Sequence, residues 1–205
     1  MSKEPERERD EGVARLIAFS DGVFAIAMTL LVLQLGVPSF KGEPTERQLW
    51  HALAQWSAYA AFVLSFVIIG LYWLVHHRTF RQIAHADAVL LWLNLIFLLG
   101  ITFMPFPTAV FERFANERPA VMLYAGALAA VGFAWFALWW YASSKPDLLV
   151  PRIAPDTIAS ERRRALVPPL IFSLSLVVAW FAPGVAPYTW LLLFGQRFLY
   201  RLHRR

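Results

Sequence analysis

The chain contains several apolar stretches long enough to cross a lipid bilayer, and these stretches limit the folds it can adopt. A transmembrane helix needs about 20 mostly apolar residues to span the roughly 30 Å hydrocarbon core. Of the 205 residues, 59% are hydrophobic and 16% are charged, whereas a soluble domain carries about 25% charged residues. A lipid-facing surface requires this excess of apolar side chains. The sequence therefore predicts an all-α polytopic membrane protein.

We expect six transmembrane helices in a single domain that covers residues 1–205. The expected spans are approximately 16–37, 49–75, 88–106, 120–141, 165–182 and 188–200. Pro38 is expected to end the first span, and Pro105 with Pro107 the third, because proline cannot continue a helix. The second span is longer than the hydrocarbon core is thick, so we expect it to tilt or protrude.

Lysine and arginine are distributed unevenly between the two sides that six spans create. Most of them lie in the N-terminal arm, the 76–87 loop, the 142–164 loop and the C-terminal tail. The positive-inside rule then predicts a cell-membrane protein with both termini in the cytoplasm. These loops also account for the net charge of +5. We expect no nucleic-acid partner, because no basic helix or aromatic–basic platform lies outside the apolar stretches.

The first span has polar residues in its first turns. A carboxylate inside a membrane costs several kcal/mol unless it is paired or hydrated. Asp21 is therefore either an ion or proton site, or an interfacial residue paired with a neighbouring helix. At about 100° per residue it points about 140° away from Ile26, which favours the pairing. The candidate partners at the same depth are Arg15, Trp73, His76, His77 and Asn94.

Other residue patterns argue against catalysis and against a bound metal. His76 and His77 are adjacent, but the spacing of a zinc motif is missing and no third ligand is evident. Asn94 lies inside the third span and is expected to hydrogen-bond between helices. The sequence shows no nucleophile–base pair, no phosphate loop and no cysteine. We expect neither an enzyme nor a cofactor.

An apolar stripe follows the polar start of the first span. Ile26, Leu30 and Leu33 stand at i, i+4 and i+7, within roughly 60° of one another on a helix. From spacing alone, ordinary packing against protein or lipid is the favoured interpretation. Periodicity does not distinguish a pore wall from a packing seam.

The segment 15–26, RLIAFSDGVFAI, resembles the signature of the TMEM175 family in its prokaryotic single-repeat form. That signature is an arginine, three further residues and then Phe-Ser-Asp at the start of the first helix. The resemblance continues at 72–78, at 91–95 and at 105–107. It thus covers the first three spans with specific motifs, whereas the last three match only in number, length and hydrophobicity.

This resemblance implies a potassium-permeable leak-type cation channel, built as a homotetramer with the first helices around a central pore. It implies a constriction made by Ile26, Leu30 and Leu33, which can gate by dewetting. Thr29 and Gln34 are then polar pore-lining residues. Many relatives carry an acidic residue where this chain has Gln34, so we expect cation preference to rest on weaker dipoles.

The resemblance also implies a polar network that fixes the first helix against the second and third. Its implied members are Arg15, Phe19, Ser20, Asp21, Trp73, His77 and Asn94.

Two alternatives to a passive channel remain open at this point. The first is a proton-coupled secondary transporter that uses Asp21 and His77, although the six spans show no visible internal repeat. The second is a membrane scaffold that transports nothing. A transporter would need a proton gradient for flux, and a scaffold would give no flux and no four-fold assembly.

Overall fold

A computed structural model describes residues 3–54, 56–151 and 153–193 of the chain. These residues form helices, together with one isolated antiparallel bridge between Ile83 and Leu149. The predicted all-α fold is confirmed for this part of the chain. Within it, five stretches are long and apolar enough to cross a membrane: Glu11–Leu35, Glu46–Phe80, Ala88–Arg113, Arg118–Ser143 and Pro155–Phe181. The sixth expected span, 188–200, lies largely outside the described residues.

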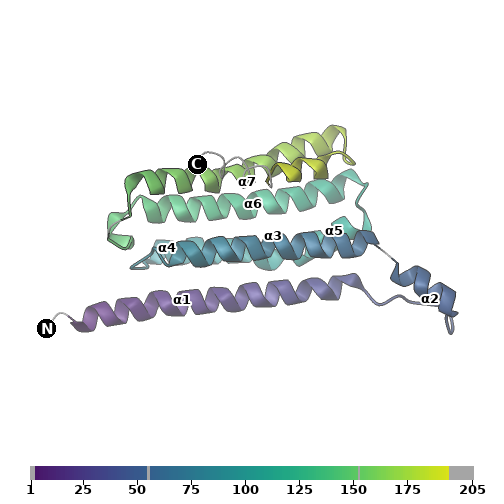
Figure 1. The fold of residues 1–205 in the computed structure, drawn as a ribbon, viewed down its shortest axis with the longest axis horizontal. Coiled ribbons are helices and arrows are strands. Elements are labelled where there is room, and N and C mark those ends of the chain that lie inside the picture. Colours follow the sequence, from purple (N-terminus) through teal and green to yellow (C-terminus); the bar gives the residue numbers. More distant parts are fainter. Residues whose placement is uncertain (1–2, 55, 152, 194–205) are drawn as a thin grey trace, which may run out of the picture.

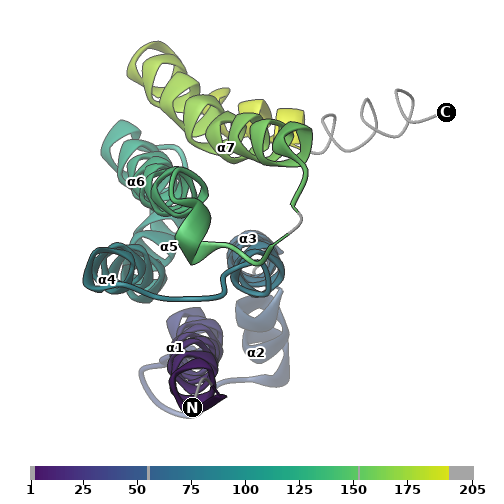
Figure 2. The same cartoon turned by 90° about the vertical axis from the view of Figure 1, so that its left-hand side faces the viewer.

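The long helices lie side by side with nearly parallel axes (Figure 1). At one edge of the bundle lies α1 (Lys3–Leu30), which contacts α3 (Trp56–Phe80) and α4 (Ala88–Phe103). The opposite edge consists of α6 (Arg118–Ser143) and α7 (Pro155–Phe181), which pack along each other. Figure 2 shows α1 and α7 on opposite sides, with α3 and α4 between α1 and the α6–α7 pair.

The helix α1 buries one face because apolar and small residues recur along it every three or four positions. The buried residues are Val13, Leu16, Ser20, Phe24 and Ala27, and Leu31 continues this face just after α1 ends. This face packs against α3 and α4. The packed face therefore contains the serine of the Phe-Ser-Asp motif but not the apolar stripe.

The first span changes its winding before it ends. After Leu30 the α-helix continues as a 3-10 helix, η1 (Leu31–Leu35), which ends at Gly36 with a φ of 57°. A positive φ favours glycine, which has no Cβ to clash with its own backbone. Side chains at i and i+3 eclipse in a 3-10 helix. Leu33 thus stays on the same side as Leu30.

The second expected span, 49–75, is divided into two helices. The short helix α2 (Glu46–Leu53) ends with Ala54 as its C-cap, and α3 begins at Trp56. Thr45 and Gln48 form a capping box, in which each side chain accepts a hydrogen bond from the other residue's backbone N–H. This box starts a helix at Glu46 without help from the bundle. The expectation of one continuous helix from 49 to 75 is therefore corrected.

The third apolar helix breaks at the prolines as expected, but the apolar stretch continues past them. After Met104 a new helix, α5 (Pro105–Arg113), begins with Pro105 in its first turn. A proline is favoured there because the backbone N–H it lacks would have no partner. The hydroxyl of Thr108 donates to the carbonyl oxygen of Met104 at 2.8 Å. The apolar stretch thus runs on to Arg113, with a break after Phe103.

The helix α7 begins at Pro155, whereas we expected the fifth span to begin near 165. Pro168 and Pro169 lie inside it and remove two backbone donors. Beside them α6 approaches closely, since a Cβ on Gly132 would lie 2.9 Å from Cδ of Pro169. Only glycine fits at this contact between α6 and α7.

Two loops meet at the end of the bundle that holds the N-terminus. The backbone N–H of Val150 donates to the carbonyl of Gln82 at 2.9 Å, and that of Ala84 to Leu148 at 2.8 Å. The second loop contains the short helix η2 (Pro146–Leu148), and η3 (Ala186–Leu191) follows α7 at the far end. These contacts join the loop after α3 to the loop after α6.

Asp87 connects α4 to α6 at the same end. One of its carboxylate oxygens caps α4 through the Leu90 N–H, and the other accepts hydrogen bonds from Tyr141 at 2.6 Å and Lys145 at 3.1 Å. The Tyr141 hydrogen bond, assisted by the Leu90 N–H and by Lys145, lowers the pKa of Asp87 to about 2. Hydrogen bonds to Tyr141 and Asp87 in turn raise the pKa of Lys145.

Candidate pore face and its polar anchor

A chain of buried hydrogen bonds joins α1 to α4 and α3. The Asn94 side-chain N–H donates to the Ser20 hydroxyl oxygen at 3.0 Å, and the Asn94 oxygen lies 3.0 Å from Nε2 of His76. Ser20 itself donates to the carbonyl of Leu16 at 2.9 Å. All three side chains have no exposed surface. We call Ser20, Asn94 and His76 the α1 anchor.

The hydrogen bonds of the α1 anchor identify a ring nitrogen of His76 that carries a proton. Because the Asn94 amide nitrogen donates to Ser20, its oxygen must accept, so Nε2 of His76 carries the proton. Nδ1 of His76 is buried without a hydrogen-bond partner among the described residues.

Aromatic rings surround the His76 imidazole. It stacks on Phe80 with ring centroids 4.1 Å apart, and Phe24, Phe97 and Trp135 lie within 6.0 Å. These rings hold the imidazole in one orientation, and this orientation fixes the hydrogen bond to Asn94.

Asp21 pairs with a neighbouring helix through Trp73. The indole N–H of Trp73 donates to a carboxylate oxygen of Asp21 at 2.8 Å. His77 lies one turn after Trp73 on α3, and the centroids of the two rings are 5.8 Å apart. Asp21 and His77 therefore both contact Trp73, at the margin of the α1 anchor.

The structure places other members of the implied network differently. Arg15 is exposed, and Phe19 is 53% exposed. His76, which the implied network omitted, bonds to Asn94, whereas His77 lies beside Trp73. The sequence carried a signal for this: His76 shares the helical face of Ser65 and Tyr72, which are both buried.

The apolar stripe lies on the other side of α1 and continues into η1, and its side chains are largely exposed. Ile26 is 59% exposed, Leu30 39% and Leu33 70%. In contrast, Phe24 on the packed face is 1% exposed. The α1 anchor therefore turns the stripe away from the rest of the subunit. We call Ile26, Leu30 and Leu33 the α1 outer face.

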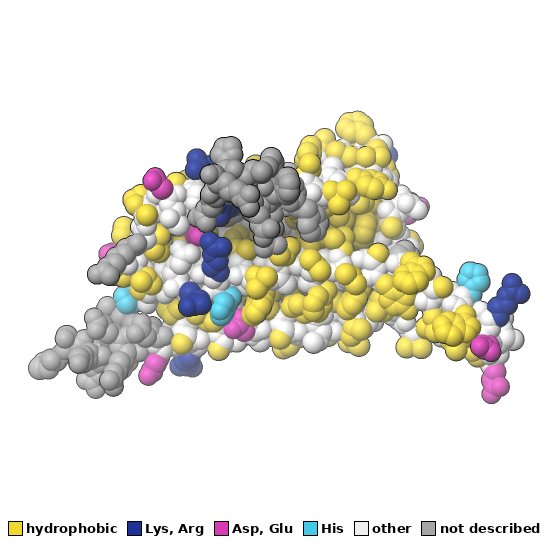
Figure 3. Space-filling model, in the orientation of Figure 1, with side chains coloured by type: hydrophobic (Ala, Val, Ile, Leu, Met, Phe, Trp, Pro, Cys, Tyr) yellow, Lys and Arg dark blue, Asp and Glu magenta, His cyan; other side chains and the backbone are white. Residues whose placement is uncertain are grey.

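The two polar residues near the α1 outer face differ in their hydrogen bonding. Thr29 is exposed, but its hydroxyl donates to the carbonyl of Ile26 at 2.9 Å. Gln34 is half-buried. The space-filling view shows the middle of the bundle as largely apolar, with charged side chains toward its two ends (Figure 3). Among the described residues, no group of three His, Cys, Asp or Glu side chains could hold a metal ion.

A second buried polar cluster lies farther along the bundle, away from α1. The Ser65 hydroxyl lies 2.8 Å from the Tyr124 hydroxyl and 2.9 Å from that of Thr108. The Tyr124 ring stacks on Phe111, with centroids 4.9 Å apart. We call Ser65, Thr108 and Tyr124 the hydroxyl cluster; it joins α3, α5 and α6.

Comparison with known proteins places these elements in a family. The family model described as the endosomal/lysosomal potassium channel TMEM175 matches residues 15–105, the part that carries the α1 anchor. A potassium channel of Streptomyces collinus is 42% identical over 158 residues, which cover 74% of this chain and 75% of that protein. The chain belongs to the TMEM175 family.

Two further comparisons extend the TMEM175 match over nearly the whole chain. A potassium channel of Chamaesiphon minutus is 34% identical over 192 residues, covering 90% of this chain and 93% of that protein. The crystal structure of a lysosomal potassium-selective channel TMEM175 homolog from the same organism superposes with a TM-score of 0.78 at 28% identity. It covers 94% of this chain and 98% of the other. The protein is thus a multi-pass membrane protein of a channel family.

Proposed function

We propose that this TMEM175 protein is a passive, potassium-permeable cation channel of the cell membrane. The names of its relatives from Streptomyces collinus and Chamaesiphon minutus support potassium as the permeant ion. In this proposal four copies surround a central pore lined by α1, and both termini lie in the cytoplasm. The Lys- and Arg-rich loops support that orientation.

The observation that carries the proposal is the division of α1 into two faces. One face is packed and hydrogen-bonded through Ser20, whereas the side chains of the α1 outer face are 39–70% exposed within the subunit. The anchor would hold α1 at one rotation, as a pore-lining helix requires. Four copies arranged around an axis would then bring the three apolar side chains of each outer face together.

A constriction of this kind acts by dehydration. Rings of Ile26, Leu30 and Leu33 would remove water from an ion without supplying oxygen ligands in its place, so the barrier depends on pore width and wetting. In this proposal Thr29 and Gln34 supply the nearest dipoles. Because Gln34 is uncharged, we expect weaker cation preference than a ring of carboxylates would give.

The proposal is tested by potassium flux into liposomes that contain the purified protein. Leu30→Asn should change flux severalfold, since an amide ring supplies the oxygen ligands that the apolar ring lacks. Leu99→Asn is the matched control, because Leu99 is 69% exposed on α4 rather than on α1. Equal flux for wild type and Leu30→Asn, with normal assembly, would show that the α1 outer face does not line the pore.

The same liposomes distinguish the two alternatives from a channel. A passive channel conducts down the potassium gradient with no proton gradient present, and Asp21→Asn should retain that flux. A transporter that uses Asp21 and His77 would need the proton gradient and lose coupling in the variant. A scaffold would give no flux and no tetramer in detergent.

A further inference from the structure

We propose that α2 is an interfacial helix that lies on the membrane surface, with its apolar side at the boundary between lipid headgroups and acyl chains. This role is separate from conduction and does not depend on it. Figure 1 shows α2 projecting from the end of the bundle opposite the N-terminus, beside the start of α3.

Local interactions hold α2 together. The capping box of Thr45 and Gln48 satisfies backbone donors at its start, and the Trp50 indole N–H donates to Glu46 one turn earlier at 3.3 Å. None of the eight residues of α2 is buried. Such a helix is formed by its own caps and side-chain pairs, and it leaves its apolar side chains for another partner.

The side chains of α2 divide into two sides. At about 100° per residue, the four apolar side chains fall within an arc of about 160°. They are Leu49, Trp50, Ala52 and Leu53. The remaining arc carries Arg47, Gln48 and His51. Glu46 is the exception: it lies within the apolar arc in the first turn of α2, where its carboxylate accepts the hydrogen bond from the Trp50 indole N–H. This division is typical of a helix that lies in the plane of the membrane interface.

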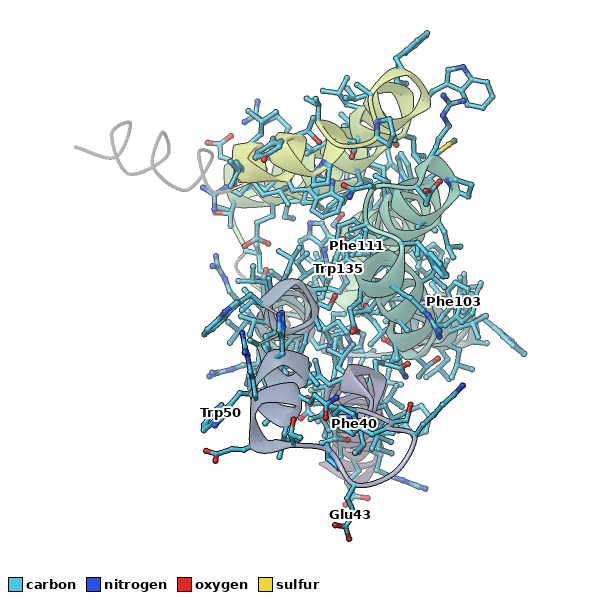
Figure 4. The ribbon with its side chains drawn as sticks, turned by 90° about the vertical axis from the view of Figure 1, so that its right-hand side faces the viewer. Phe40, Glu43, Trp50, Phe103, Phe111 and Trp135 are labelled. Atoms are coloured by element: carbon cyan, nitrogen blue, oxygen red, sulfur yellow. The ribbon has the colours of Figure 1, made fainter. Side chains whose placement is uncertain are left out.

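The apolar side chains of α2 are more exposed than is usual for a helix that faces water. Trp50 is 67% exposed, and Leu49 and Leu53 are each 41% exposed. Figure 4 views this end and shows Trp50 pointing away from the bundle. At the first turn of α3, Trp56 is 79% exposed. Tryptophan gathers at the membrane–water boundary, because its ring is apolar and its N–H is polar.

The depth of α2 follows from its two connections. The first membrane-spanning stretch ends at Leu35. The second stretch is apolar from Glu46 onward, but its long helix, α3, begins only at Trp56. The helix is thus tied to two membrane-spanning segments at the level where both leave the hydrocarbon core. We therefore choose the lipid surface as the partner, in preference to a second copy of the chain.

Site-directed spin labelling tests this choice, and the chain suits it because the sequence has no cysteine. Single variants Leu49→Cys and Leu53→Cys carry the label on the apolar side, and Arg47→Cys and His51→Cys are the matched controls on the polar side. The protein is reconstituted in phosphatidylcholine–phosphatidylglycerol vesicles. Collision of the label with oxygen, which enriches in lipid, is compared with collision with a water-soluble nickel chelate.

The proposal predicts an oxygen-to-nickel ratio about threefold or more higher at positions 49 and 53 than at 47 and 51. A high nickel collision rate at all four positions would place α2 in water and overturn the proposal. Low collision with both reagents at 49 and 53, with an immobilised label, would show packing against another subunit, and would overturn it too. Potassium flux measured on the same vesicles tests the proposed function separately.

Discussion

The two buried polar clusters differ in what they hold. The α1 anchor joins α1 to α4 and α3 through an amide and an imidazole. The hydroxyl cluster joins α3, α5 and α6 and does not include α1. The side chains of both clusters are buried, and each cluster connects three helices. Only the α1 anchor sets the rotation of the helix that carries the apolar stripe.

This difference separates stability from conduction. Loss of a hydrogen bond in either cluster leaves buried polar atoms unpaired, which destabilises the fold. A loss in the α1 anchor would also free the rotation of the α1 outer face. Variants in either cluster should therefore destabilise the fold, but only variants in the α1 anchor should also change flux.

The largest effect is expected for Asn94→Leu. The change removes the acceptor of His76 and the donor to Ser20, so we expect the free energy of unfolding to fall by about 2–3 kcal/mol. Potassium flux should fall as well, because α1 loses its fixed rotation. Thermal unfolding in detergent and flux in liposomes measure the two effects. Asn116→Leu, at an exposed position, is the control that should change neither.

A smaller effect is expected for Trp73→Phe, which keeps an aromatic ring beside His77 but removes the donor to Asp21. We expect a loss of about 1–2 kcal/mol, because the hydrogen bond to the carboxylate is charge-assisted but only part-buried. Trp92→Phe, on a residue 67% exposed, is the control. Unchanged unfolding in Trp73→Phe would mean that the pairing of Asp21 adds nothing to the anchor.

For the hydroxyl cluster, Tyr124→Phe should lower the free energy of unfolding by about 1 kcal/mol, the usual net value of one hydrogen bond. The ring and its stacking on Phe111 remain, so flux per folded channel should be unchanged. Tyr59→Phe removes a hydroxyl from an exposed ring and serves as the reference. A large change in flux for Tyr124→Phe would contradict the separation of roles between the two clusters.

The smallest effect concerns pH and lies outside both clusters. The pKa of Asp87 is lowered to about 2 in the folded protein, so its contribution to stability is complete above its ordinary pKa. That contribution is lost as the pH falls from about 4 through about 2. Asp87→Asn, which can still cap α4, should flatten this part of the curve of unfolding temperature against pH. An unaltered acid dependence would show that the contacts with Tyr141 and Lys145 are not maintained.

The sequence predicted the helical class and the position of the polar motif, because long apolar runs and an intramembrane carboxylate are strong signals. It predicted Trp73, His76 and His77 among the candidate partners of Asp21, whereas the family resemblance implied a network with His77 and without His76. Neighbouring residues on a helix differ by about 100°, and the rotation of α3 depends on which face packs. That packing is decided by contacts among several helices, which a single sequence does not display.

Helix boundaries were harder to predict for a similar physical reason. The start of α2 at Glu46 depends on the capping box of Thr45 and Gln48, a local signal that hydropathy hides. The start of α5 at Pro105 depends on whether a proline ends one helix or begins the next, and the same residue suits both roles. The rotation of α1 could be predicted in part, since its packed face repeats every three or four residues.

The 3-10 winding of η1 has a consequence for length. A 3-10 helix rises about 2.0 Å per residue, against about 1.5 Å in an α-helix. From Ile26 to Leu33 the axial distance is therefore about 12 Å rather than about 10.5 Å. In the proposed pore, a longer apolar constriction makes a continuous single file of water less stable. The change in winding lengthens the barrier without adding a residue.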